Sequence, residues 1–98
     1  MTTEIDPART ALLVMDYQNG IMGRVADGDT LLLAGISTSG VVLSTVRDGH
    51  DRDYRLIVIS DLCADPEPDI HEFQVQRIFP RQAEVIEVAD LAALFAAA

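Results

Sequence analysis

The chain has 98 residues, 49% of them hydrophobic, so it is long enough for one compact domain and too apolar to be disordered. Sixteen acidic residues against seven basic ones give a net charge of -9, which disfavours binding to nucleic acid and to an anionic membrane surface. No apolar run reaches the roughly 18–20 residues of a membrane span, and the N-terminal residues show no signal-peptide pattern. We therefore expect a single domain over residues 1–98 with a cytoplasmic location.

Four short apolar runs predict strands. In chain order they cover residues 11–15, 30–36, 55–60 and 83–88, and turn-forming or charged residues bound them. Unbroken apolar runs of this length are typical of strands that are covered on both faces, as in a parallel sheet. The last run contains Glu84 and Glu87, which indicates an edge strand protected by charge.

Helical patterns lie between these runs. Apolar residues at 41–43 and 46 form a stripe, with Thr38 or Ser39 available as N-cap. In the next connection, Asp65 before a proline is typical of an N-cap, the apolar residues 70, 73, 78 and 79 would pack on the sheet, and Pro80 would end the helix. The alanine-rich residues 90–98 predict a short last helix. The alternation predicts an α/β fold, a three-layer Rossmann-like sandwich with a mainly parallel four-stranded sheet.

The connection between the first two strands is short. Only about ten residues separate the end of the first run from residue 30, whereas a parallel crossover usually takes a dozen or more. The sequence leaves open whether this crossover is tight or the first strand pairs differently.

Two stretches resemble the isochorismatase-like cysteine hydrolases. The stretch ALLVMDYQNGIM is similar to the first strand of that family and the aspartate that follows it. The stretch LLLAGISTSGVVLSTVRDGHDRDYRLIVISDLCAD is similar to a later block with Gly-Ile-x-Thr, a helix, a strand and Asp-x-Cys-Ala. Family members are generally longer, so the resemblance implies that the middle region is missing here, with a junction near residues 23–30.

The resemblance implies an Asp–Lys–Cys triad for the hydrolysis of small amides, whereas isochorismatase itself cleaves a vinyl ether without the cysteine. Asp16 matches the aspartate, which acts as general base in the family. The alternative interpretation is that Asp16 is only a turn residue that ends the first strand. The chain contains no lysine, and Val41 occupies the nucleophile position. Only one residue of the triad is therefore present, because an arginine does not replace the lysine and a valine cannot form a thioester.

The function expected from these residues is that of an isochorismatase-like hydrolase that is impaired or inactive in this form. Two alternatives remain open: a non-catalytic α/β binding or oligomerisation domain, and an internally deleted product without a function of its own. The sequence does not identify the substrate, because the region that would line it is absent.

A strand-to-helix turn provides the candidate ligand-binding residues Ser37, Thr38, Ser39 and Gly40. By resemblance, this turn supplies backbone donors to an oxyanion, often after a non-proline cis peptide, and N–H groups at a helix start attract anions and carbonyl oxygens. A simple N-cap turn explains the same residues equally well. Because parallel strands end together, we expect Asp16 and this turn to border one cleft for a small molecule.

The remaining reactive residues predict no metal or cofactor. Cys63 is the single cysteine, so it cannot form an internal disulfide, and we expect it to be a packed side chain rather than a substitute nucleophile. His50 and His71 lack the spacing of metal ligands, and we expect both on helix surfaces. No glycine-rich phosphate loop is present.

The first strand also predicts a homo-oligomer, most simply a dimer. If the family's middle strands are missing, residues 11–15 form a sheet edge without charge or proline, and such an edge tends to pair with another chain. The net charge of -9 opposes this association, so salt should strengthen it.

Overall fold

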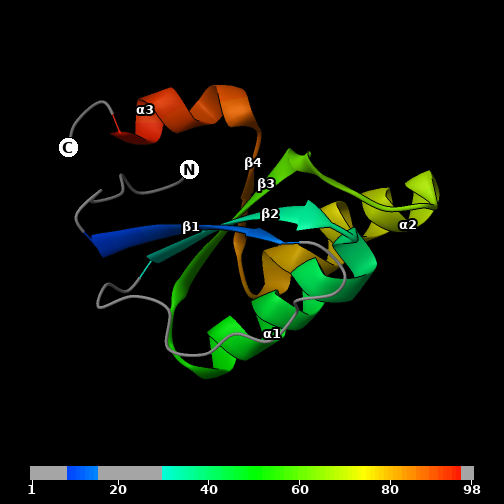
Figure 1. The fold of residues 1–98 in the computed structure, drawn as a ribbon, viewed down its shortest axis with the longest axis horizontal. Helices are drawn as coiled ribbons and strands as arrows, with labels where there is room; N and C mark the ends of the chain where they lie inside the picture. Colours follow the sequence, from blue (N-terminus) through cyan, green and yellow to red (C-terminus); the bar gives the residue numbers. More distant parts are fainter. Residues whose placement is uncertain (1–8, 16–29, 96–98) are drawn as a thin grey trace.

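The computed structural model describes residues 9–15 and 30–95. Its four strands form one sheet in the order β1-β2-β3-β4, and every neighbouring pair is parallel (Figure 1). The strands are β1 (Thr10–Met15), β2 (Thr30–Ile36), β3 (Arg55–Ala64) and β4 (Glu84–Ile86). The predicted parallel α/β fold is confirmed, and β1 pairs with β2 in register from Thr10↔Thr30 to Met15↔Gly35.

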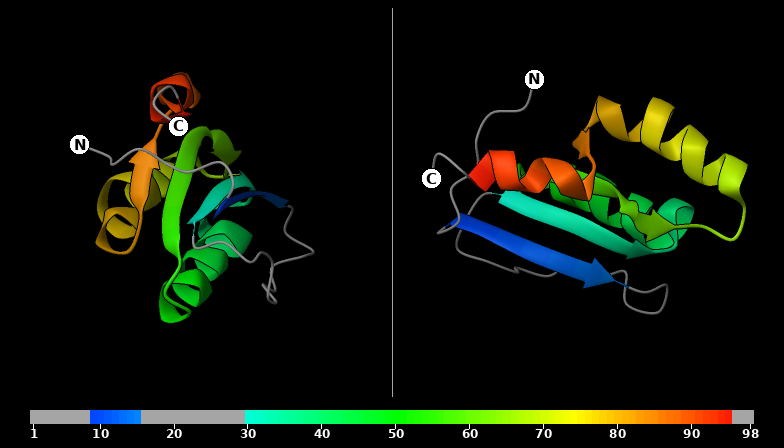
Figure 2. Two further views of the ribbon diagram at one scale, coloured as in Figure 1. Left: turned by 90° about the vertical axis from the view of Figure 1, so that its left-hand side faces the viewer. Right: turned by 90° about the horizontal axis from the view of Figure 1, so that it is seen from above.

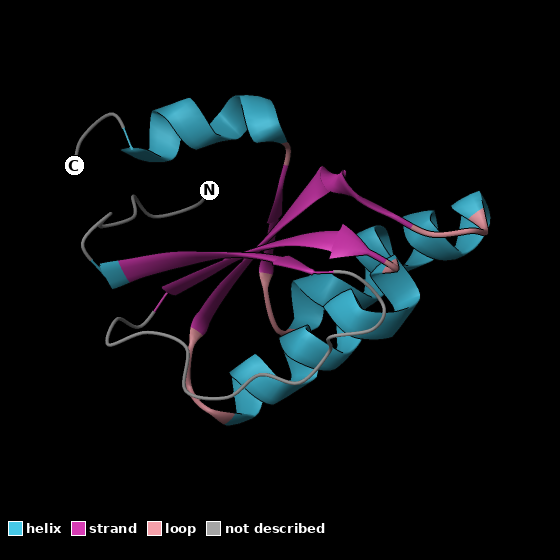
Figure 3. Ribbon diagram, viewed as in Figure 1, coloured by secondary structure: helices cyan, strands magenta, loops and turns pink. Residues whose placement is uncertain are grey.

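Helices cover both faces of the sheet, which gives the three layers (Figure 2). On one face, a wide helical turn Thr38–Val42 leads directly into α1 (Leu43–Asp51). The same face carries α2 (Pro68–Phe73), which continues through Gln74–Ile78 and Phe79–Arg81. On the opposite face, Val88–Asp90 leads into α3 (Leu91–Phe95) (Figure 3). None of the helices described is long and apolar enough to cross a membrane.

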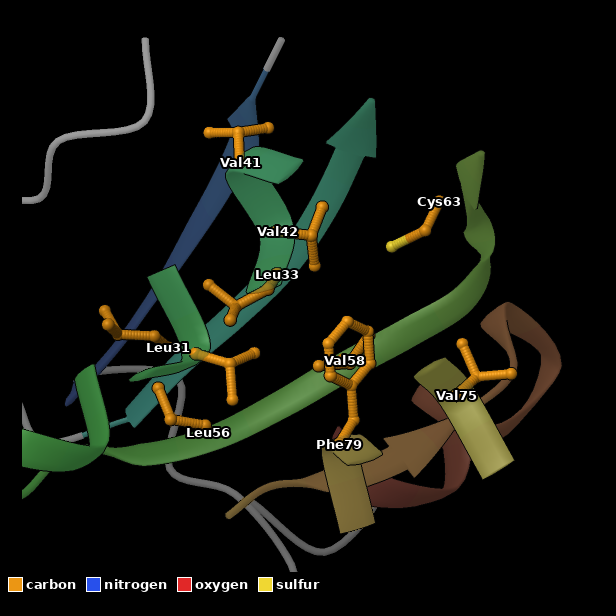
Figure 4. Packing of buried hydrophobic residues seen from close by; sticks show 10 residues of the cluster. Leu31, Leu33, Val41, Val42, Leu56, Val58, Cys63, Val75 and Phe79 are labelled. Atoms are coloured by element: carbon orange, nitrogen blue, oxygen red, sulfur yellow. The ribbon is translucent and has the colours of Figure 1, made fainter. Parts of the chain in front are cut away.

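The α1-face core is the larger of two buried clusters (Figure 4). Apolar side chains from β2 and β3 point toward α1 and toward the helical segment that follows α2. The members are Leu31, Leu33, Val41, Val42, Val46, Leu56, Val58, Cys63, Val75 and Phe79. Gly49 allows α1 to approach the sheet closely, because a Cβ there would lie 2.7 Å from Leu56 Cδ2.

The α3-face core is smaller and lies over the middle of the sheet. Its members are Leu32, Ile57, Ile59, Ile86 and Leu94. Leu12 of β1 is the register neighbour of Leu32, and therefore lies on this face, but 57% of it is exposed. The α3 face is thus closed over β3 and β4 and open over β1.

Strand β3 differs from its prediction, since it continues past residue 60 to Ala64. Leu33 pairs with Val58 and Gly35 with Cys63, so β3 holds three extra residues between these two pairs. This bulge explains the error: Ser60 and Asp61 are typical of a strand end, but Ser60 Oγ donates to the Ile86 carbonyl and Asp61 accepts from the Val88 N–H. The bulge places Cys63 inside the strand, beside Gly35, rather than after it.

The predicted helix starts were wrong. Ser37, not Thr38 or Ser39, is the N-cap residue of the first helical segment, and Glu67, not Asp65, precedes α2. The side chains expected to cap these helices bond to distant residues, Thr38 to His71 and Asp65 to Ser39, although Asp65 also accepts the N–H of Glu67.

The second helical region also differs in its packing and its end. Phe79 is fully buried as expected, whereas Phe73 is 53% exposed. Pro80 does not stop the helical course, because Phe79–Arg81 forms a further 3-10 turn. The predicted last strand is shorter than residues 83–88 and consists of Glu84–Ile86, at the sheet edge as expected.

Candidate functional site

The turn at residues 37–40 follows the carboxyl end of β2. Gly35 has a φ of 142°, which favours glycine, and the peptide bond between Ile36 and Ser37 is cis, as the family resemblance implies for this place. Ser37 then has extended backbone angles, and its carbonyl accepts the N–H groups of Gly40 at 3.2 Å and Val42 at 3.1 Å. The first turn of the helix is therefore wide, and two of its backbone donors are used within the chain.

Asp65 holds the turn from the other side. The backbone N–H of Ser39 donates to Asp65 Oδ2 at 2.8 Å, and Ser39 Oγ donates to the same oxygen at 2.6 Å. The other carboxylate oxygen, Oδ1, accepts the N–H of Glu67 at 3.2 Å. The hydrogen bond from the Ser39 hydroxyl is the largest cause that lowers the pKa of Asp65 below its ordinary value, so the group is ionised at neutral pH.

His71 makes a second contact with the turn. Its Nδ1 lies 2.7 Å from Oγ1 of Thr38, and the Thr38 side chain is fully buried. As expected, both histidines lie on helices, but His71 on α2 is half-buried against the turn, whereas His50 on α1 is exposed. Sequence reasoning missed the pair Thr38–His71 and the pair Ser39–Asp65 because contacts across 33 and 26 residues leave no local pattern.

Val41 lies in the helical turn at the nucleophile position that the resemblance assigns. Its side chain is 5% exposed and belongs to the α1-face core, and its carbonyl accepts a hydrogen bond from Thr45 Oγ1 at 2.8 Å. A buried aliphatic side chain therefore stands at the position that the resemblance assigns to the thiol.

Cys63 is 8% exposed and its sulfur points into the α1-face core (Figure 4). Burial raises the pKa of its thiol to about 11, against a smaller opposing effect of a backbone hydrogen bond with Gly35. The predicted role as a packed side chain is confirmed. The arrangement lacks the exposure and the lowered pKa of a reactive cysteine.

Asp16 lies outside the described residues. Met15, the residue before it, is the last residue of β1 and pairs with Gly35 of β2. Gly35 lies two residues before the 37–40 turn. The predicted cleft between Asp16 and the turn, and the role of Asp16 as general base, therefore stay predictions.

No group of three or more His, Cys, Asp or Glu side chains within residues 9–15 and 30–95 is arranged to hold a metal ion. The polar groups at the carboxyl end of the sheet are engaged with one another: Asp65 with Ser39, His71 with Thr38, and Asp61 with the Val88 N–H. The N–H of Ser39 donates to Asp65 and that of Gly40 donates to Ser37, so a ligand oxygen would compete with these partners for the backbone donors of the turn.

The comparisons with known proteins support the family resemblance. The family model described as Isochorismatase domain matches residues 24–90, more than half of the 98 residues. An uncharacterised isochorismatase family protein of Escherichia coli O157:H7, YecD, is 33% identical over 63 residues, which are 64% of this chain and 34% of that protein. The matched residues of the family model contain the later block of the resemblance but not Asp16.

Solved structures give the same fold. An isochorismatase family protein from Burkholderia thailandensis matches with a TM-score of 0.68 and 30% identity, over 70% of this chain and 36% of that one. A cysteine hydrolase from Pseudomonas syringae pv. phaseolicola 1448A matches with a TM-score of 0.65 and 26% identity, over 72% of this chain and 38% of that one. A nicotinamidase from Bacillus subtilis matches with a TM-score of 0.54 and 25% identity, over 61% of this chain and 34% of that one. The chain thus spans about a third of the length of these relatives.

Proposed function

Since the chain belongs to the isochorismatase family, we propose that it is a hydrolase-type domain for a small amide or vinyl ether in which the thiol-dependent step is lost. The substrate class comes from the family resemblance and from relatives that include a cysteine hydrolase and a nicotinamidase. The observation that carries the proposal is Val41, a buried aliphatic side chain at the nucleophile position.

Thiol-dependent catalysis has no nucleophile at the position that the resemblance assigns to it. Val41 has no lone pair for attack on a carbonyl carbon. A pKa of about 11 leaves roughly one Cys63 thiol in ten thousand ionised at pH 7, and the sulfur faces the core. We therefore propose that water attacks the substrate directly.

In the water route, a carboxylate takes a proton from water, the water oxygen attacks the carbonyl carbon, and the amine leaves with a proton. Asp16 is the proposed base, and the backbone donors of the 37–40 turn would polarise the carbonyl oxygen. Without the covalent step and the family lysine, we expect turnover to be slow.

The experiment is a hydrolysis assay on a panel of nicotinamide, a carbamoyl compound and a vinyl ether, with the wild type, Asp16→Asn and Cys63→Ser. We expect slow turnover that Asp16→Asn abolishes and that Cys63→Ser and iodoacetamide leave unchanged. Loss of activity in Cys63→Ser would overturn the proposal, because it would make Cys63 the nucleophile.

A non-catalytic binding domain is the second candidate, and the contact between Asp65 and Ser39 favours it. A carboxylate of the chain already accepts the backbone and side-chain donors of Ser39. Ligand binding without turnover in the same panel, unchanged by Asp16→Asn, would support this candidate over the hydrolase.

We also propose that two copies of the chain associate through β1. This strand is at the sheet edge, its sequence TALLVM carries no charge, and Leu12 is 57% exposed on the face that α3 leaves open. An edge strand can pair with its own copy about a two-fold axis, while the net charge of -9 opposes association. Light scattering at low and high salt should therefore show a dimer that salt strengthens and Leu12→Lys weakens. A monomer at tens of micromolar in both conditions would contradict the proposal.

A further inference from the structure

Two side-chain contacts tie the connection after β3 to the turn after β2. Asp65 accepts both donors of Ser39, and His71 bonds to the buried Thr38 hydroxyl. Asp65 directly follows Ala64, the last residue of β3, so the strand holds the position of its carboxylate. The contacts span 26 and 33 residues. They join the segments that follow β2 and β3, two parallel strands whose carboxyl ends lie at the same end of the sheet.

The carboxylate of Asp65 is oriented as a bound ligand would be. Its Oδ2 lies 2.8 Å from the Ser39 nitrogen and 2.6 Å from Ser39 Oγ, and its Oδ1 is fixed by the Glu67 N–H. Hydrogen bonds of this length to an ionised oxygen are stronger than neutral ones. The Ser39 N–H is also one of the donors that the proposed function offers to a substrate oxygen.

We propose that Asp65 is an autoinhibitory contact: its carboxylate occupies the oxygen position on Ser39, and a small carboxylate-bearing or carbonyl-bearing ligand must displace it to bind. This inference rests on the proposed function, which makes the 37–40 turn the ligand site. Because Asp65 is part of the chain, its effective concentration at Ser39 is in the millimolar range or above, and a free carboxylate competes poorly with it.

Acetate is the probe that tests this inference, since it carries the same carboxylate without the chain. In ¹⁵N-labelled protein, the amide signal of Ser39 reports its occupancy. We expect acetate to shift this signal in Asp65→Ala in a saturable way, with an affinity at least tenfold higher than in the wild type. Asp61→Ala is the matched control, because Asp61 also lies near the end of β3 and accepts a backbone N–H at 2.8 Å, but from Val88 rather than from the turn. It should behave like the wild type.

Equal acetate affinity in the three proteins, or no saturable shift of Ser39 in Asp65→Ala, would overturn the inference. Should Asp65→Ala lose its dispersed spectrum, Asp65→Asn serves instead: it keeps an acceptor oxygen, loses the charge, and should also bind acetate more tightly than the wild type. The titration needs no turnover. If the wild type shows no hydrolysis but Ser39 of Asp65→Ala binds acetate, only the hydrolase proposal is contradicted. If the wild type hydrolyses a substrate but Asp65→Ala binds no acetate, only this inference is contradicted.

Discussion

The two faces of the sheet carry hydrophobic cores of different size. Among the described residues, ten side chains form the α1-face core and five form the α3-face core. The α1 face is covered by a long helical segment and by the segment after α2, whereas the α3 face is covered by one short helix and is open at Leu12. Stability should therefore depend more on the α1 face.

This difference bears on the proposed function, because the position that the family resemblance assigns to the thiol lies in the larger α1-face core. Val41, at the nucleophile position, and Cys63, the single thiol, are both members of the α1-face core. A side chain that is packed between a helix and a sheet cannot reach a substrate without leaving that core. The comparison predicts that both positions respond to substitution as packing residues.

The largest expected effect comes from Phe79→Ala, which removes a fully buried ring from the α1-face core. Such changes lower the free energy of unfolding by about 3–5 kcal/mol. Leu94→Ala on the α3 face should cost about 2–3 kcal/mol, because its short helix can settle into the space. Urea denaturation measures both values, and an equal or larger loss for Leu94→Ala would contradict the ranking of the faces.

Val41→Thr should have the next largest effect. It keeps the shape of the side chain but places a hydroxyl in an apolar core, which costs about 1–3 kcal/mol of unfolding free energy. Val41→Cys is the control, since a buried thiol behaves as a small hydrophobe and should cost less than about 1.5 kcal/mol. Equal stability of Val41→Thr and the wild type in urea would mean that position 41 is open to water.

The ion pair between Arg55 and Glu84 should contribute less than either core. Arg55 Nε donates to Glu84 Oε2 at 2.7 Å and Nη2 to Oε1 at 2.9 Å, joining β3 to β4. We expect a coupling energy of about 0.5–1 kcal/mol in a double-mutant cycle with Arg55→Gln and Glu84→Gln. The more exposed pair Arg52–Asp48 is the comparison and should give about 0.3 kcal/mol. A larger coupling for Arg52–Asp48 would contradict this order.

The smallest expected effect is the pH dependence that Asp65 adds. The pKa of Asp65 is lower in the folded chain than in the unfolded one, where it is about 3.9, so the folded chain binds fewer protons. The stability difference between the wild type and Asp65→Asn should be fully present above about pH 5 and disappear as the pH falls through the folded pKa. Urea midpoints between pH 2.5 and 6 measure it. A difference that grows with acidity would contradict the geometry at Ser39.

The fold could be predicted because its signals are local. Apolar runs placed the four strands within a few residues, and the stripe at residues 41–46 identified the helix that covers one face. The end of β3 could not be predicted, because Ser60 and Asp61 are compatible with a strand only when Ile86 and Val88 supply their partners. A bulge that depends on another strand leaves no pattern of its own.

The candidate site was only half predictable for a similar reason. The position of the turn after β2 followed from its glycine and hydroxyl residues, and the resemblance marked Val41. The partners of the turn, Asp65 and His71, were assigned to a helix start and a helix surface, because each also has a common local explanation. The end of β3 brings Asp65 to Ser39, and the packing of α2 beside the turn brings His71 to Thr38.

The alkylation rate of Cys63 tests the central claim, that the thiol chemistry of the family is absent from this chain. Native protein and protein unfolded in urea are treated with iodoacetamide at pH 7.5, and the intact mass is followed with time. Because Cys63 is 8% exposed and the pKa of its thiol is raised to about 11, native protein should remain unmodified while the unfolded chain takes one adduct. Alkylation of the native protein as fast as of the unfolded chain would contradict the account.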